Sequence, residues 1–185
     1  MKNEVRLIGG QWKRSKLPVA DKPGLRPTPD RVRETLFNWL GQDLSGWRCL
    51  DAFAGSGALG FEAASRGAAE VQLLERDVEL VRSLRDSATR LKATMVSVEA
   101  TDALLWMARC APKRFELLLL DPPFDASLTA AACAAATLLV ADDGFIYVES
   151  PEPLSTSLPL PAEGFEVWRQ GRAGLVHFHL LRRNS

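Results

Sequence analysis

The chain has 185 residues, of which 46% are hydrophobic and 25% charged, and its formal net charge is zero. This length suits one domain and is too short for two ordinary ones. The composition excludes a disordered tail, a collagen and a disulfide scaffold. No apolar run approaches the roughly 20 residues that span a bilayer, and no apolar signal segment follows residues 1–4. We therefore expect a globular protein of the cytoplasm with no membrane partner.

The cysteines also favour a protein of the reducing cytoplasm. Cys49, Cys110 and Cys133 are odd in number, widely spaced and free of any Cys-x-x-Cys pattern. This pattern argues against a disulfide framework and against a zinc site, so we expect no metal.

Charge is unevenly distributed along the chain. Residues 1–33 carry nine Lys or Arg side chains and three Asp or Glu side chains, a net charge of +6, so the remaining residues carry −6. A basic arm on an acidic body favours contact with a polyanion such as nucleic acid. A merely solvated, charged N-terminus is the alternative.

The first elements form a predicted hairpin. Residues 4–8 alternate like a short strand, Gly9 and Gly10 interrupt it, and residues 17–19 form a second extended piece. We place a small basic N-terminal hairpin extension at residues 1–22.

A helix is predicted next. Thr28 is expected to be its N-cap and Pro29 its first helical residue, with Val32 and Leu36 on one apolar face. Gly41 is expected to end it.

The main domain, residues 23–185, alternates short apolar runs with helical segments. Residues 117–120 are all leucine, as expected for a parallel strand buried on both faces. The predicted strands are residues 48–53, 71–74, 95–98, 115–120, 145–148, 165–169 and 175–181. The predicted helices are residues 57–66, 78–91, 102–109 and 127–139. The predicted fold is a doubly wound, Rossmann-like α/β domain whose seven-stranded sheet is mostly parallel, with an antiparallel C-terminal strand.

A glycine-rich loop, residues 51–60 (DAFAGSGALG), ends a predicted strand and opens a predicted helix. This is the context of a nucleotide-binding loop, because glycines permit close approach of a ligand to the backbone. Glu75 follows at the end of the next strand, where an acidic side chain can accept hydrogen bonds from a ribose diol. The loop alone does not separate a nicotinamide cofactor from S-adenosylmethionine.

Two further carboxylates bear on the choice of cofactor. Asp51 would repel a pyrophosphate but suits a ligand with a sulfonium and an α-ammonium group, which favours S-adenosylmethionine. Asp102 follows the third strand, where it could accept from an adenine amino group or cap the following helix.

The second motif is Asp121-Pro122-Pro123-Phe124, at the carboxyl end of the fourth strand. Asp121 and the carbonyl of Pro122 can each accept one N–H of an exocyclic amino group and draw its nitrogen toward sp³ geometry. Two prolines make the turn rigid, and their carbonyls are expected to need no local hydrogen bond. Phe124 offers a ring for stacking on the base.

Together with residues 24–38 (GLRPTPDRVRETLFN), these motifs resemble the bacterial 16S ribosomal RNA guanine-N2 methyltransferases, the small-subunit methyltransferase D family. The resemblance extends over nearly the whole chain. It implies a class I, S-adenosylmethionine-dependent enzyme that methylates N2 of one guanine in 16S rRNA of the small ribosomal subunit. Asp121 to Phe124 would then be catalytic.

Two more sets of residues are expected to bind ligands. The cofactor would be held by Asp51, Phe53, Gly55, Ser56, Gly57, Glu75 and Asp102. RNA would be contacted by Arg6, Trp12, Lys13, Arg14, Lys16, Arg26 and Arg31. Arg33 is a further candidate for phosphate contact, and Trp12 could equally anchor the hairpin to the body.

Three alternatives remain open. The same tetrad could orient the N6 amino group of adenine in RNA or DNA. The chain could instead be a non-catalytic RNA-binding factor of ribosome assembly. A nicotinamide oxidoreductase is disfavoured by Asp51 and by the lack of an evident hydride-transfer acid near the loop. No heptad pattern is visible, so we expect a monomer.

Overall fold

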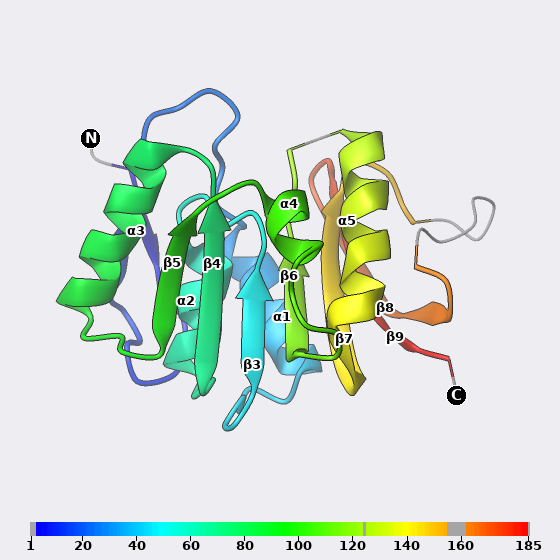
Figure 1. The fold of residues 1–185 in the computed structure, drawn as a ribbon. Helices are drawn as coiled ribbons and strands as arrows, with labels where there is room; N and C mark the ends of the chain where they lie inside the picture. Colours follow the sequence, from blue (N-terminus) through cyan, green and yellow to red (C-terminus); the bar gives the residue numbers. More distant parts are fainter. Residues whose placement is uncertain (1–2, 124, 155–161, 185) are drawn as a thin grey trace.

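The structure is a computed structural model that describes residues 3–123, 125–154 and 162–184 (Figure 1). Its N-terminal elements are β1 (Glu4–Arg6), β2 (Lys16–Pro18) and α1 (Asp30–Trp39). The first half of the body comprises β3 (Arg48–Asp51), α2 (Ala58–Ser65), β4 (Glu70–Glu75), α3 (Val78–Arg90) and β5 (Val96–Ala100). The second half comprises α4 (Ala103–Met107), β6 (Phe115–Leu120), α5 (Ala126–Leu139), β7 (Val140–Ser150), β8 (Phe165–Ala173) and β9 (Val176–Arg183).

The central sheet has seven strands in the order β5-β4-β3-β6-β7-β9-β8. The pairs from β5 to β7 are parallel, whereas β9 is antiparallel to both β7 and β8. The chain winds outward from β3 through β4 to β5, then returns to β6 on the other side of β3. The predicted doubly wound, mostly parallel sheet with antiparallel C-terminal pairing is therefore confirmed.

Alternating side chains of the strands bury against helices on opposite faces. Cys49, Leu117 and Leu119 belong to the cluster formed with α1, α2 and α3. Leu118 and Leu120 belong to the cluster formed with α4 and α5, which lie in front of the sheet in Figure 1. The all-leucine run in β6 thus reflects burial on both faces.

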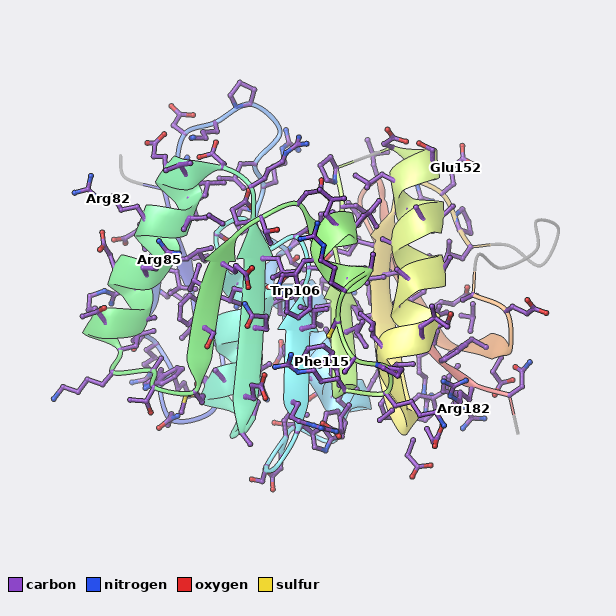
Figure 2. The ribbon with its side chains drawn as sticks, viewed as in Figure 1. Arg82, Arg85, Trp106, Phe115, Glu152 and Arg182 are labelled. Atoms are coloured by element: carbon purple, nitrogen blue, oxygen red, sulfur yellow. The ribbon has the colours of Figure 1, made fainter. Side chains whose placement is uncertain are left out.

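Figure 2 shows how side chains of α3 and α4 lie relative to the central sheet. Trp106 of α4 packs against Phe115 of β6 with ring centroids 6.3 Å apart. Arg82 of α3 projects away from the sheet into solvent, whereas the Arg85 guanidinium donates to the backbone carbonyl of Val98 in β5 at 3.1 Å. Within the described ranges, no helix is both long enough and apolar enough to cross a membrane.

The predicted N-terminal hairpin is present and docks on the body. β1 and β2 pair antiparallel, and Leu7 and Leu17 are buried in the core cluster that includes α1 and α2. The backbone amides of Ile8 and Gly9 donate to the Glu62 carboxylate of α2, at 2.9 and 2.8 Å. The hairpin therefore contributes to the core.

The start of α1 differs from its prediction. Pro29 is the N-cap, no side chain caps the helix, and Asp30 is the first helical residue. The Thr28 hydroxyl donates instead to the Glu149 carboxylate at 2.7 Å. Assigning Thr28 as the N-cap was wrong because this buried, distant acceptor takes its hydroxyl. Gly41 lies just beyond the helix with φ +87°.

Strand β7 is longer than predicted. It runs from Val140 to Ser150, directly after α5, with a register shift against β6 between Phe115 and Leu117. Its polar residues Asp142 and Asp143 are exposed between the buried Val140 and Gly144, in the part of the strand where the register shifts.

Arg33 is fully buried, so its expected contact with RNA phosphate is wrong. Its guanidinium donates to the Glu62 carboxylate at 3.0 Å and to the backbone carbonyls of Arg6 and Thr28. Glu62 is also fully buried and accepts from Arg66 as well. This network ties the hairpin and α1 to α2.

Replacing Arg33 with Met should destabilise the protein strongly. Removing one partner of a buried ion pair leaves the other buried charge undercompensated, which costs about 3 kcal/mol. Arg31→Met, on the exposed side of the same helix, should cost about 0.5 kcal/mol or less. Urea unfolding monitored by tryptophan fluorescence measures both. Equal losses in the two variants would contradict the structural role of Arg33.

Candidate active site at the carboxyl end of the sheet

Three carboxylates meet where central strands end. Asp51 ends β3, Asp121 directly follows β6, and Glu149 lies one residue before the end of β7. These strands are adjacent and parallel, so their carboxyl ends share one edge of the sheet. The change in winding direction between β3 and β6 is the place where open α/β sheets bind ligands.

The glycine loop has the backbone geometry that its sequence predicts. Gly55 and Gly57 have φ of +52° and +79°, and Gly57 caps the amino end of α2. A Cβ on Gly57 would lie 2.7 Å from side-chain carbons of Leu84 and Phe61. Glycine is therefore required there by backbone conformation and by space.

Glu75 holds this loop in place. Its Oε2 accepts from the Gly55 amide at 3.0 Å and its Oε1 from the Asp77 amide at 2.9 Å. A carboxylate offers about four lone-pair sites, so each oxygen keeps the capacity to accept a ribose hydroxyl.

Asp51 is almost completely buried beneath the loop. Its Oδ2 accepts from the Gly60 amide at 2.9 Å, while its Oδ1 has no hydrogen-bond partner among the described residues. Burial, together with the charges of Glu75 and Glu149, raises the pKa of Asp51 to about 7. A buried acceptor without a donor fits a cationic ligand such as the α-ammonium of S-adenosylmethionine, reached directly or through a water.

Two of the remaining predicted cofactor residues lie in this loop, and the third precedes α4. Phe53 is half-buried against the cluster on the α4 and α5 face, and Ser56 is buried. Asp102 is exposed, and its Oδ1 accepts from the Leu105 amide at 3.0 Å as the N-cap of α4. Asp102 thus has the capping role, and its role toward adenine stays a prediction.

The residues after β6 form a tight turn. Asp121 is partly exposed, Pro122 is buried and Pro123 is exposed, while Phe124 lies outside the described residues. The Pro123 carbonyl accepts from the Asp125 amide at 2.6 Å. The expectation that both proline carbonyls stay free of local bonds is therefore wrong for Pro123.

A buried polar group beside Asp121 was missed by the sequence analysis. The Glu149 Oε1 accepts from the Thr28 hydroxyl at 2.7 Å and from the Tyr147 hydroxyl at 2.9 Å. Burial raises the pKa of both Asp121 and Glu149, and the Glu149 and Asp51 charges raise that of Asp121 further. The sequence carried one signal for this group. Glu149 directly follows the predicted apolar strand 145–148, just as Asp121 directly follows the predicted strand 115–120.

The segment between β2 and α1 crosses this edge of the sheet, as the blue loop at the top of Figure 1. Lys22 forms ion pairs with Asp77 and Glu79 at the start of α3, at 2.6 and 2.8 Å. The Leu25 side chain lies beside Gly55, 3.1 Å from where a Cβ would stand. This segment therefore covers the glycine loop and delivers Thr28 to Glu149.

Most of the predicted RNA contacts lie on the surface. Arg6, Lys13, Arg14, Lys16, Arg26 and Arg31 are exposed. Lys16 is paired with Glu4 at 2.7 Å. Trp12 is half-buried and packs against the core, as expected for an anchor of the hairpin.

The strand order, the glycine loop and the carboxylates at the switch point define a Rossmann-like methyltransferase fold. The family described as Conserved hypothetical protein 95 matches residues 5–182. Ribosomal RNA small subunit methyltransferase D of Escherichia coli K12 is 41% identical, covering 98% of this chain and 91% of that protein. Its Haemophilus influenzae counterpart is 38% identical, covering 98% and 95%. The solved structure of an Escherichia coli protein named as a methyltransferase superposes with a TM-score of 0.86 at 38% identity, covering 98% of both chains.

This chain belongs to the ribosomal RNA small subunit methyltransferase D family. The resemblance noted from its motifs is thereby confirmed.

The raised pKa of Asp51 predicts a pH dependence of stability. The native state keeps a proton on Asp51 that the unfolded chain loses near pH 4, so the free energy of unfolding should fall as pH rises from about 4 to about 7. Asp51→Asn should make this fall shallower. Urea titrations at pH 5 and pH 8 measure the difference, and an equal fall in both proteins would show that Asp51 titrates normally.

Proposed function

We propose that this protein transfers a methyl group from S-adenosylmethionine to the exocyclic N2 of a guanine in 16S rRNA of the small ribosomal subunit. As a member of its family it is a ribosomal RNA methyltransferase. The observation that carries the particular reaction is the position of Asp121 at the switch point, beside the glycine loop and partly open to solvent.

The cofactor residues follow from the geometry of the loop. Glu75 would accept from the ribose diol, and the Asp51 Oδ1 would accept from the ammonium group or from a water bound to it. Phe53, Ser56 and Asp102 would complete the pocket. S-adenosylmethionine, when bound, supplies a methyl group on a positively charged sulfur that leaves as a neutral thioether.

The chain's own part in the reaction is alignment and electrostatics. Asp121 and the Pro122 carbonyl would each accept one N–H of the guanine amino group, which leaves its lone pair free to form the new N–C bond. The nitrogen then carries a positive charge, and Asp121 is placed to accept the proton that it loses. Pro123 and Phe124 would shape the wall on which the base rests.

RNA binding is proposed for the exposed cations of the hairpin and of α1. Arg6, Lys13, Arg14 and Lys16 lie on the hairpin, Arg26 on the covering segment and Arg31 on α1, with Trp12 in the loop that joins the two hairpin strands. The target guanine must leave its stack to bring N2 to Asp121. We propose that the protein acts as a monomer in the cytoplasm.

Family membership favours this function over the alternatives. It argues against an adenine N6 methyltransferase, a non-catalytic assembly factor and a nicotinamide oxidoreductase. The buried Asp51 carboxylate near the glycine loop also disfavours the pyrophosphate of a dinucleotide.

The role of Asp121 is tested by Asp121→Asn. We expect methyl transfer to unmethylated small subunits to fall roughly 100-fold, because the amide cannot accept the proton and offers a weaker acceptor. Affinity for S-adenosylmethionine should change little. Asp125→Asn is the control, because Asp125 is exposed and Asn also caps helices well. A methylation rate of Asp121→Asn equal to that of the control would refute the assignment.

The RNA-binding hairpin is tested by point substitutions, because deleting it would remove Leu7 and Leu17 from the core. Lys13→Gln combined with Arg14→Gln should weaken RNA binding and reduce the salt dependence of log K by about one per lost phosphate contact. Arg82→Gln combined with Arg172→Gln removes two exposed cations elsewhere and is the control. An unchanged salt slope in the hairpin variant would exclude it as the RNA contact.

A further inference from the structure

Asp121 and Glu149 lie side by side at the carboxyl edge of the sheet. Strands β6 and β7 are parallel neighbours, and Leu120 of β6 is paired with Val148 of β7. Asp121 and Glu149 are the next residues after this pair, so they stand at the same level. Neighbouring strands of a sheet are about 4.8 Å apart. A ligand that reaches Asp121 is therefore also beside Glu149.

The two side chains also belong to the same face of the sheet. Leu119 and Tyr147 lie two residues earlier in the two strands, and both belong to the core cluster formed with α1 and α2. Side chains alternate between faces along a strand, so residues two apart share a face. The bond that Glu149 accepts from Thr28, at the start of α1, agrees with this orientation.

One oxygen of the Glu149 carboxylate is occupied and the other is open. The hydroxyls of Thr28 and Tyr147 both donate to Oε1, at 2.7 and 2.9 Å. Oε2 accepts no hydrogen bond from any described residue, and it is not one of the described atoms that are sealed from solvent without a partner. Oε2 is therefore the oxygen that a ligand beside Asp121 would meet.

The two hydroxyls favour the ionised form of Glu149. Burial raises the pKa of Glu149, whereas the bonds from Thr28 and Tyr147 lower it. Thr28 is only 4% exposed and Tyr147 is completely buried, so solvent does not compete for these bonds. Two donors on one oxygen stabilise the negative charge. The ionised Oε2 can only accept a hydrogen bond.

The ring atom next to the amino group differs between the two purines. In guanine the N2 amino group neighbours N1, which carries a hydrogen and donates. In adenine the N6 amino group neighbours an N1 that carries a lone pair and accepts. A flipped-out base is recognised through hydrogen bonds to this edge. A carboxylate beside the amino group would gain a bond from guanine and would meet a lone pair of adenine.

We propose that Glu149 selects guanine by accepting its N1–H through Oε2, while Asp121 and the Pro122 carbonyl hold the adjacent amino group. Thr28 and Tyr147 occupy Oε1 and leave Oε2 to the base. This inference rests on the proposed function and names the group by which the site distinguishes guanine from adenine. No covalent bond forms or breaks at Glu149, whose part is recognition.

The burial of Glu149 makes such a contact selective. The residue is 4% exposed, so little water is at hand to satisfy Oε2 when a base offers it no hydrogen. A site that is built to accept a hydrogen bond rejects a ligand without the donor, because its own buried acceptor is then left unpaired.

The substrate side of this contact is tested with 2-aminopurine. This base has the same amino group at C2, but its N1 carries a lone pair instead of a hydrogen. Once the methylated guanine has been located, 16S rRNA with 2-aminopurine at that position is offered to the wild-type protein in the form, naked or within small subunits, in which the guanine is methylated. We expect kcat/KM to be at least about tenfold lower than for guanine. Equal values would overturn the proposal.

The protein side is tested by Glu149→Gln. The Gln carbonyl can still accept from Thr28 and Tyr147, while its NH2 group takes the place of Oε2 and donates. The preference for guanine over 2-aminopurine should therefore fall at least about tenfold, because the variant now suits the lone pair on N1. Asp125→Asn, an exposed change nearby, should keep the wild-type preference.

The ratio of the two rates separates recognition from stability. If Glu149 only supports the fold, Glu149→Gln lowers both rates by the same factor, and the unchanged ratio would overturn its role in recognition while guanine methylation by the wild type stands. Absence of methyl transfer to every RNA, with S-adenosylmethionine bound, would instead overturn the proposed function.

Discussion

The buried carboxylate of Glu62 is the interaction on which the arrangement of the N-terminal third depends. It receives two backbone amides from the hairpin, the guanidinium of Arg33 from α1 and that of Arg66 from its own helix. A buried carboxylate is stable only when it is paired and hydrogen-bonded, so these elements stabilise one arrangement together. The segment that joins the hairpin to α1 is thereby held at both ends over the glycine loop.

The hydrogen bonds of Glu62 also link the basic surface of the hairpin to the candidate active site. The hairpin presents cations to solvent, and the chain leaving it crosses the carboxyl edge of the sheet and delivers Thr28 to Glu149. The same edge collects Asp51 and Asp121 from β3 and β6. Burial raises the pKa of all three carboxyl groups, and the charge of Glu149 raises the pKa of Asp51 and Asp121 further. A cationic cofactor and an amino donor are the ligands that such a site stabilises.

Much of this could be predicted from local pattern. Alternating strands and helices predicted the sheet, because burial on both faces leaves uninterrupted apolar runs such as residues 117–120. The glycine loop was predictable because positive φ and close packing require glycine at Gly57. Family membership, carried by short motifs, was predictable too. Assignment of individual residues to cofactor, RNA and catalysis remains a prediction.

The predictions that failed concern residues whose contacts lie far away in the sequence. Thr28 precedes a proline and has the pattern of an N-cap, yet its partner Glu149 is 121 residues away. Arg33 lies in a basic stretch, but the pairing with Glu62 that buries it is set by tertiary packing. The hydrogen bonds that Thr28 and Tyr147 donate to Glu149 could not be predicted, because no periodicity reports which side chains converge at the end of a sheet.

The central claim is methylation of guanine N2 in ribosomal RNA. The most direct measurement is transfer of a labelled methyl group from S-adenosylmethionine to unmethylated small subunits, to naked 16S rRNA and to duplex DNA, followed by nucleoside analysis. The account predicts label in N2-methylguanosine from a ribosomal substrate. Label in N6-methyladenosine, or none on any substrate while the cofactor binds, would contradict it.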